Sequence, residues 1–132
     1  MHAKLTEIGA IEEFDRLLAA SGERPLLVFK YSVTCGTSAQ ALDELFAHLN
    51  ERPADLTYAI VTVQTHRDVS NAIASTLGVR HETPQALLIR DGHVVWSASH
   101  YRVTADAVES ALKDVLNNAP EGAATPPQST LS

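Results

Sequence analysis

Apolar residues follow two spacings along this chain, and these spacings predict alternating helices and strands. Four segments carry an apolar residue at every third or fourth position, as amphipathic helices do: residues 10–20, 37–52, 69–77 and 104–116. Four shorter segments are rich in apolar and β-branched residues, as strands are: residues 26–29, 57–63, 85–90 and 93–97. The predicted order is therefore helix, strand, helix, strand, helix, strand, strand and helix.

Turn and capping signals separate these segments. Pro53 ends the second predicted helix, and Gly78 is a typical C-terminal stop for the third. Asp91-Gly92 lies between two strand-like runs, which is the strongest short-range signal for a β-hairpin. Thr104 is placed to cap the last helix.

The order of elements predicts the topology of the sheet. Strands joined by a helix run parallel, whereas the two strands of a hairpin run antiparallel. We therefore expect an α/β fold in which a four-stranded mixed sheet is flanked by helices, with an extra helix before the first strand. The chain has 132 residues, enough for a single domain, which we assign to residues 1–116. Residues 117–132 are rich in Pro, Ala, Ser and Thr and are predicted to form a disordered tail.

Charge and composition argue against several classes of protein. Ten Lys and Arg face sixteen Asp and Glu, and no basic cluster is present, so nucleic acid is not an expected partner. No apolar run reaches the roughly 18 residues of a membrane span, and the N-terminal residues lack the pattern of a signal peptide. A single cysteine offers no disulfide framework. The expected location is the cytoplasm and the expected state is a monomer.

Cys35 is the only cysteine, and its position is the main functional signal in the sequence. It falls where a predicted strand ends and a helix begins, the edge of an α/β sheet at which ligands bind. The first N–H groups of that helix favour the thiolate, which is the attacking species in thiol–disulfide exchange. Gly36 adds no side chain beside the sulfur, and Ser38 stands where a two-cysteine motif has its second thiol. We therefore expect a mixed disulfide with another molecule. A buried structural cysteine is the competing interpretation.

Thr83-Pro84 precedes the third predicted strand, in a loop that the topology places beside Cys35. Proline is tolerated as the first residue of a strand, and this alone would explain its presence. A cis bond at Pro84 would instead direct the backbone of Thr83 toward an extended substrate.

Histidines and one lysine are secondary candidates. The six histidines are scattered without the spacing of a metal site, so no metal is expected, and His48 is expected on an exposed helix face. His81 and His100 could approach Cys35 and tune its thiolate. Lys30 could do the same from the preceding strand, or could be an exposed structural residue.

Four blocks of sequence are together similar to the monothiol bacilliredoxins of the thioredoxin-like superfamily. They are FKYSVTCGTS at residues 29–38, VSNAIA at 69–74, GVRHETPQ at 78–85 and VWSASH at 95–100. The resemblance covers residues 10–116. It departs from the family pattern at Gly36-Thr37, where bacilliredoxins usually have Pro-Ile. This difference removes a ring beside the sulfur and leaves the identity of the small thiol open.

The resemblance implies a thioredoxin-like fold and a thiol–disulfide oxidoreductase. Such proteins remove bacillithiol, a low-molecular-weight thiol, from S-thiolated client proteins. Cys35 would take up the small thiol, and a second thiol or a partner reductase would regenerate it. No cofactor is implied beyond this co-substrate, and Pro84 matches the cis-proline of the family. The residues implied to contact substrate are Thr34, Gly36, Thr37, Ser38, Thr83 and Pro84.

Two other functions remain open. Cys35-Gly36-Thr37-Ser38 also resembles the Cys-Gly-Phe-Ser motif of monothiol glutaredoxins, which carry an iron–sulfur cluster between two subunits. Thr37 replaces the phenylalanine of that motif, and no Gly-Gly pair follows the predicted hairpin. A thioredoxin-like binding module without turnover is the third possibility, since a fold does not determine a function.

Overall fold

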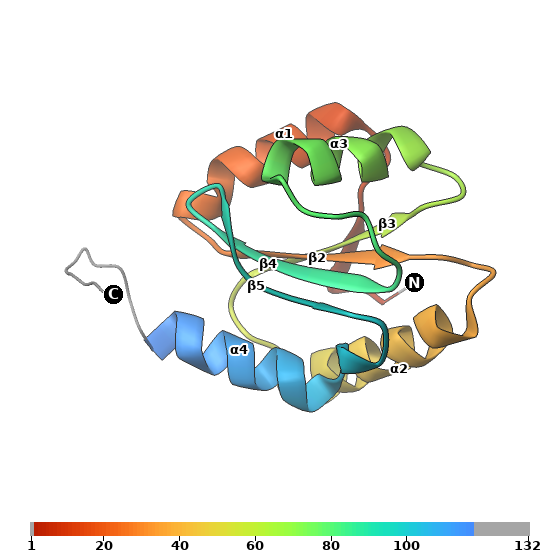
Figure 1. Ribbon diagram of the computed structural model, residues 1–132. Helices are drawn as coiled ribbons and strands as arrows, with labels where there is room; N and C mark the ends of the chain where they lie inside the picture. The colour runs from red at the N-terminus through yellow and green to blue at the C-terminus, as the bar shows by residue number, and fades with distance from the viewer. Residues whose placement is uncertain (1, 118–132) are drawn as a thin grey trace.

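The computed structural model describes residues 2–117, which form three layers: helices, a sheet, and helices again (Figure 1). Helices α1 (Ile11–Ala19) and α3 (Arg67–Leu77) cover one face of the sheet, and α2 (Gly36–Glu51) and α4 (Ala105–Asn117) cover the other. The strands are β1 (Leu5–Glu7), β2 (Leu26–Tyr31), β3 (Thr57–Thr62), β4 (Gln85–Arg90) and β5 (His93–Ser99). Two 3₁₀ turns, η1 (Ala20–Gly22) and η2 (His100–Arg102), follow α1 and β5.

The sheet has five strands in the order β1-β3-β2-β4-β5. β2 lies at its centre, parallel to β3 and antiparallel to β4, and β4 forms the predicted hairpin with β5. The α/β fold with its extra first helix is confirmed, but the prediction of four strands was wrong because β1 was missed. β1 has three residues, of which only Leu5 is buried, so it shows no strand pattern. Its parallel pairing with β3, with Leu5 opposite Tyr58, defines it instead.

The central strand β2 is buried on both faces, which explains its continuous apolar sequence. Leu27 and Phe29 pack in the core under α2 and α4, and Leu26 and Val28 pack in the core under α1 and α3. Lys30 continues the second set and is the one charged side chain among the fully buried residues of the described chain. Of the two interpretations of Lys30 that the sequence left open, the exposed structural residue is therefore wrong.

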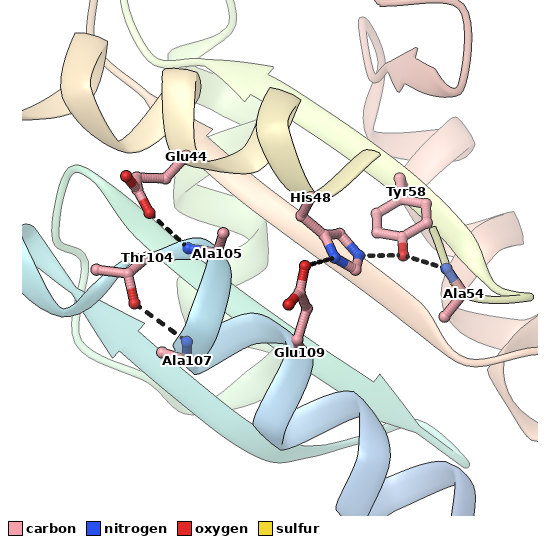
Figure 2. A network of polar contacts seen from close by, with 8 residues as sticks. All are labelled: Glu44, His48, Ala54, Tyr58, Thr104, Ala105, Ala107 and Glu109. Carbon is pink, nitrogen blue, oxygen red and sulfur yellow. Dashed lines mark hydrogen bonds and ion pairs between the residues drawn. The ribbon is translucent and has the colours of Figure 1, made fainter. Parts of the chain in front are cut away.

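Helix ends follow the capping signals in the sequence. Gly78 follows α3 with a φ of 67°, the left-handed conformation that glycine adopts without strain. The Thr104 hydroxyl accepts a hydrogen bond from the N–H of Ala107 at 3.1 Å, so its predicted capping role is confirmed (Figure 2). A carboxylate oxygen of Glu44 accepts a second hydrogen bond at this helix end, from the N–H of Ala105 at 2.7 Å. This contact joins α2 to the start of α4.

A buried polar network also joins α2 to α4 (Figure 2). His48 is 1% exposed, so its expected place on an exposed helix face is wrong. A carboxylate only accepts hydrogen bonds, so His48 Nδ1 donates to Glu109, at 3.1 Å. In the tautomer that carries its proton on Nδ1, Nε2 accepts from the Tyr58 hydroxyl at 2.6 Å, while that hydroxyl accepts from the N–H of Ala54 at 2.9 Å. Burial, with Glu109 nearby, raises the pKa of Tyr58 and so favours this protonated form.

The described part of the chain ends with α4. This helix ends at Asn117, just past the predicted domain boundary at residue 116. The predicted disordered tail otherwise lies outside the described residues. No helix within residues 2–117 is both long enough and apolar enough to cross a membrane, and these residues hold no cluster of three or more potential metal ligands.

Candidate active site

Cys35 stands at the N-terminus of α2, at the end of the loop that follows β2. It is the N-cap residue, with extended backbone angles of φ −111° and ψ 120°, and its carbonyl accepts a hydrogen bond from the N–H of Ala39 at 3.2 Å. Its thiol is free and the residue is partly exposed. The sulfur is therefore available to a partner at the edge of the sheet.

The start of α2 favours the thiolate of Cys35. The backbone N–H of Ser38 is the largest cause that lowers the pKa of this thiol. Partial burial acts in the opposite direction, and the Thr37 N–H and the two hydroxyl side chains lower the pKa further. These are the orphan donors of a helix N-terminus, which stabilise a negative charge placed before them.

Ser38 is fully buried beneath the loop that carries Cys35. Its hydroxyl oxygen accepts a hydrogen bond from the N–H of Ser32 at 3.2 Å. A serine here ties the loop to α2 and supplies a polar hydrogen near the sulfur, but it cannot form a disulfide. Any disulfide of Cys35 must therefore be intermolecular.

Gln64 holds the other side of this loop, a role that the sequence analysis did not predict. It follows β3, and its Oε1 accepts a hydrogen bond from the N–H of Val33 at 3.1 Å. Its Nε2 donates to the hydroxyl of Ser32 at 2.7 Å. The one available signal was topological, because the carboxyl ends of the parallel strands β2 and β3 meet at one edge. The amide of Gln64 neither titrates nor acts as a nucleophile, so its residue type alone does not indicate a role at the site.

The Thr83–Pro84 peptide bond is cis. It belongs to the loop between α3 and β4, which reaches β4 at the edge of the sheet where β2 ends (Figure 1). β4 begins at Gln85, which pairs with Lys30 near the end of β2, so the two loops adjoin. Pro84 is buried, and its carbonyl accepts a hydrogen bond from the N–H of His100 at 2.9 Å. Thr83 is half-buried, which leaves part of it open to a partner.

The remaining predicted contact residues flank the sulfur. Thr34 and Gly36 are exposed and Thr37 is half-buried. A Cβ built on Gly36 would meet no atom within 4 Å, so the fold itself does not require glycine there. The space beside the sulfur is open to a substrate.

Lys30, His81 and His100 were candidates to tune the thiolate, but none of them is among the groups that shift the pKa of Cys35. Lys30 Nζ instead donates to the carbonyl of Ser70 at 3.4 Å on the face of α3, and burial lowers its pKa to about 8. Partial burial lowers the pKa of His81, and the charges of Lys30 and Arg67 lower it further. The backbone of α2, rather than these side chains, favours the thiolate.

Comparison with solved structures identifies the fold. A structure described as a candidate oxidoreductase with a thioredoxin fold is 31% identical, with a TM-score of 0.72 over 81% of this chain and 92% of the other. Mitochondrial thioredoxin 3 from Saccharomyces cerevisiae is 20% identical, with a TM-score of 0.65 over 84% and 95% of the two chains. A poplar thioredoxin h mutant is 20% identical, with a TM-score of 0.70 over 90% and 88%. The fold is that of thioredoxin.

Comparison with family models is more specific than the fold. The model described as monothiol bacilliredoxin BrxC matches residues 6–108, which include the Cys35 loop, Gln64 and the cis-proline loop. Together with the thioredoxin fold, this match assigns a thiol redox function to the chain. The chain belongs to the monothiol bacilliredoxin family.

Proposed function

We propose that this protein is a monothiol oxidoreductase that removes bacillithiol, or a similar small thiol, from S-thiolated cysteines of client proteins. The observation that supports it best is the pairing of Cys35 with Ser38. The thiol is partly exposed with a lowered pKa, and the position of a resolving thiol is filled by a buried hydroxyl. Such a site attacks a disulfide but cannot release the product by forming an internal one.

The reaction is a single exchange of disulfide partners. The Cys35 thiolate attacks the sulfur of the small thiol in the client's mixed disulfide, and a bond forms between these two sulfurs. The bond to the client sulfur breaks, and the client leaves as a thiolate. Cys35 is oxidised and the client cysteine is reduced, so the electrons balance without a further cofactor.

The residues around the sulfur support this reaction by binding and orientation. Thr83 would pair its backbone with the extended client segment beside Pro84, while Thr34, Gly36 and Thr37 border the open side of the sulfur. A second molecule of small thiol, or a partner reductase, would then attack the mixed disulfide on Cys35 and restore the thiolate. One chain suffices for this cycle. We expect it to operate in the cytoplasm, where thiols are kept reduced.

Transfer of the small thiol tests the proposal directly. Reduced wild-type protein and a Cys35→Ser variant are each mixed with a model protein that carries bacillithiol on its single cysteine. Intact mass spectrometry follows both partners. We expect the bacillithiol mass on the wild type alone, together with the freed model protein. Absence of any adduct on Cys35 would contradict the proposal and favour a binding module without turnover.

A further inference from the structure

Lys30 carries a buried charge that the exchange reaction does not use. Its side chain is 0% exposed, and among the described residues its ammonium group donates one hydrogen bond, to the carbonyl of Ser70 at 3.4 Å. An ammonium group has three N–H donors, and taking it out of water destabilises a fold unless its surroundings compensate in full. A methionine of similar length would fill the same space without this cost. A role in function therefore explains Lys30 better than a role in stability.

Gln85 on the neighbouring strand has an unused acceptor on the same face of the sheet. It stands directly opposite Lys30 in the antiparallel pairing of β4 with β2, so the Cβ atoms of the two residues lie about 5 Å apart. Gln85 is 4% exposed, and its Oε1 is the one buried side-chain N or O atom of the described residues without a hydrogen-bond partner. The spare donors of Lys30 and the unused acceptor of Gln85 therefore belong to adjacent side chains.

Both residues are connected to the cis-proline loop between α3 and β4. Gln85 Nε2 donates to the carbonyl of Arg80 in this loop at 3.0 Å. Ser70, whose carbonyl accepts from Lys30, also has its hydroxyl oxygen within hydrogen-bond distance of Nδ1 of His81, at 3.4 Å. Ser70 lies in α3 and is fully buried, so it offers a fixed point for both contacts. The middle of the loop is therefore held from β4 and from α3.

These contacts fix the segment that leads to Thr83, the half-buried residue whose backbone would pair with a client. Thr83 follows His81 directly after Glu82, so one end of its segment is tied to α3. At the other end, the carbonyl of Pro84 accepts a hydrogen bond from the N–H of His100 at 2.9 Å. Fixing a binding segment before its partner arrives reduces the entropy that is lost on binding.

We propose that Lys30 and Gln85 are positioning residues, which hold Thr83 in the conformation that pairs with the backbone of an extended client. This inference rests on the proposed function and deepens it, because it assigns the residues that prepare the client-binding segment. Both residues act through the loop and not on the sulfur, since neither is among the groups that shift the pKa of Cys35. Their loss should weaken binding of the client backbone and leave the thiolate unchanged.

Two substrates separate a positioning role from an effect on Cys35. One is a peptide that carries bacillithiol on its single cysteine, and the other is the mixed disulfide of bacillithiol with 2-mercaptoethanol, which has no client backbone. Single-turnover rates are measured at increasing concentrations of each. Lys30→Met should lower the second-order rate constant for the peptide about tenfold, the effect of about one lost hydrogen bond, by weakening binding rather than the saturated rate. The rate with the small disulfide should not change.

Two further variants complete the comparison. Gln85→Met removes the donor to the carbonyl of Arg80 without adding a charge, so it should also weaken binding of the peptide alone. Lys113→Met is the matched control, because it makes the same lysine-to-methionine change at an exposed position on α4. It should change neither rate. Urea unfolding shows that each variant is folded under the conditions of the assay.

Hydrogen exchange of the cis-proline loop gives a readout that does not depend on turnover. Its backbone amides should exchange faster in Lys30→Met than in the wild type, while those of the Cys35 loop should not change. Unchanged exchange in the loop, or an equal effect on the two substrates, would overturn the inference and leave the proposed function standing. If the wild type reacts with neither substrate, the proposed function fails, and the client-binding role of these residues fails with it.

Discussion

The hydroxyl of Ser38 accepts a hydrogen bond from the backbone N–H of Ser32, across the loop that carries Cys35. Both serines are buried, so water cannot readily replace the Ser38 hydroxyl as the acceptor for the Ser32 N–H. The same hydroxyl also lowers the pKa of Cys35, but less than the backbone N–H of Ser38 does. Ser38 therefore combines a structural role with a minor electrostatic one, and the two can be separated by mutation.

Replacing Ser38 by alanine should affect stability more than thiol chemistry. The variant leaves the Ser32 N–H buried without an acceptor, at a cost of about 1–3 kcal/mol in the free energy of unfolding. The pKa of Cys35 should rise but remain below that of an ordinary free cysteine, because the helix N–H groups persist. Urea unfolding measures the first effect, and the pH profile of iodoacetamide alkylation measures the second. A Cys35 pKa equal to that of an unstructured peptide thiol would show that the hydroxyl, not the helix, stabilises the thiolate.

Lys30 should make the stability of the fold rise with pH. Burial lowers its pKa from 10.5 to about 8 in the folded state. Below pH 8 both states are protonated, and the folded state bears the full cost of a buried charge. Between pH 8 and 10.5 the unfolded chain still holds a proton that the folded chain has lost, so the free energy of unfolding increases with pH.

Comparison of Lys30→Met with the wild type isolates this effect from other titrating groups. The difference in unfolding free energy between the two proteins should shrink steadily from pH 8 toward pH 10.5, with Lys30→Met at least as stable as the wild type at pH 7. Urea unfolding over this pH range provides the measurement. A constant difference would mean that Lys30 is solvated in solution and keeps an ordinary pKa.

The sequence was sufficient for the parts of this molecule that depend on local pattern. Cys35 is the only thiol and follows a strongly apolar strand, so its place at a strand-to-helix junction could be predicted. Lys30 shows the limit of this reasoning. A strand buried on both faces does not alternate between apolar and polar residues. Its sequence therefore does not show which face of the sheet Lys30 lies on, or that the carbonyl of Ser70 accepts its hydrogen bond.

The residues that were missed depend on contacts between distant segments. Gln64 is separated from Ser32 by a helix and a strand, and its amide becomes informative only when the ends of β2 and β3 meet. His48 was expected to be exposed because a lone histidine is usually solvated, but it shares the buried face of α2 with Leu45 and Leu49 and is covered by α4.

The network around Tyr58 should be structural rather than catalytic. Tyr58→Phe removes the hydroxyl and leaves the Ala54 N–H and His48 Nε2 without their partner, which should cost about 1–3 kcal/mol of unfolding free energy. His48 is thirteen residues beyond Cys35 on α2, and at about 1.5 Å per residue it lies about 20 Å along the helix. The transfer rate and the alkylation rate of Cys35 should therefore remain at wild-type values. A loss of transfer in a folded variant would reveal coupling between the two ends of α2.

Gln64 should act as a positioning residue for the Cys35 loop, and a glutamate in its place distinguishes this role from simple stability. In Gln64→Glu one carboxylate oxygen can still accept from the Val33 N–H, but the ionised side chain cannot donate to the Ser32 hydroxyl. It also adds a negative charge beside Thr34, the residue before Cys35, which disfavours the thiolate. The midpoint of the alkylation profile should move to higher pH, and transfer at neutral pH should slow by a similar factor. Asn117→Asp makes the same amide-to-acid change at the far end of α4 and should leave the profile unchanged. If Gln64→Glu shifts neither the midpoint nor the rate, the contacts of Gln64 with the loop do not position Cys35 for exchange.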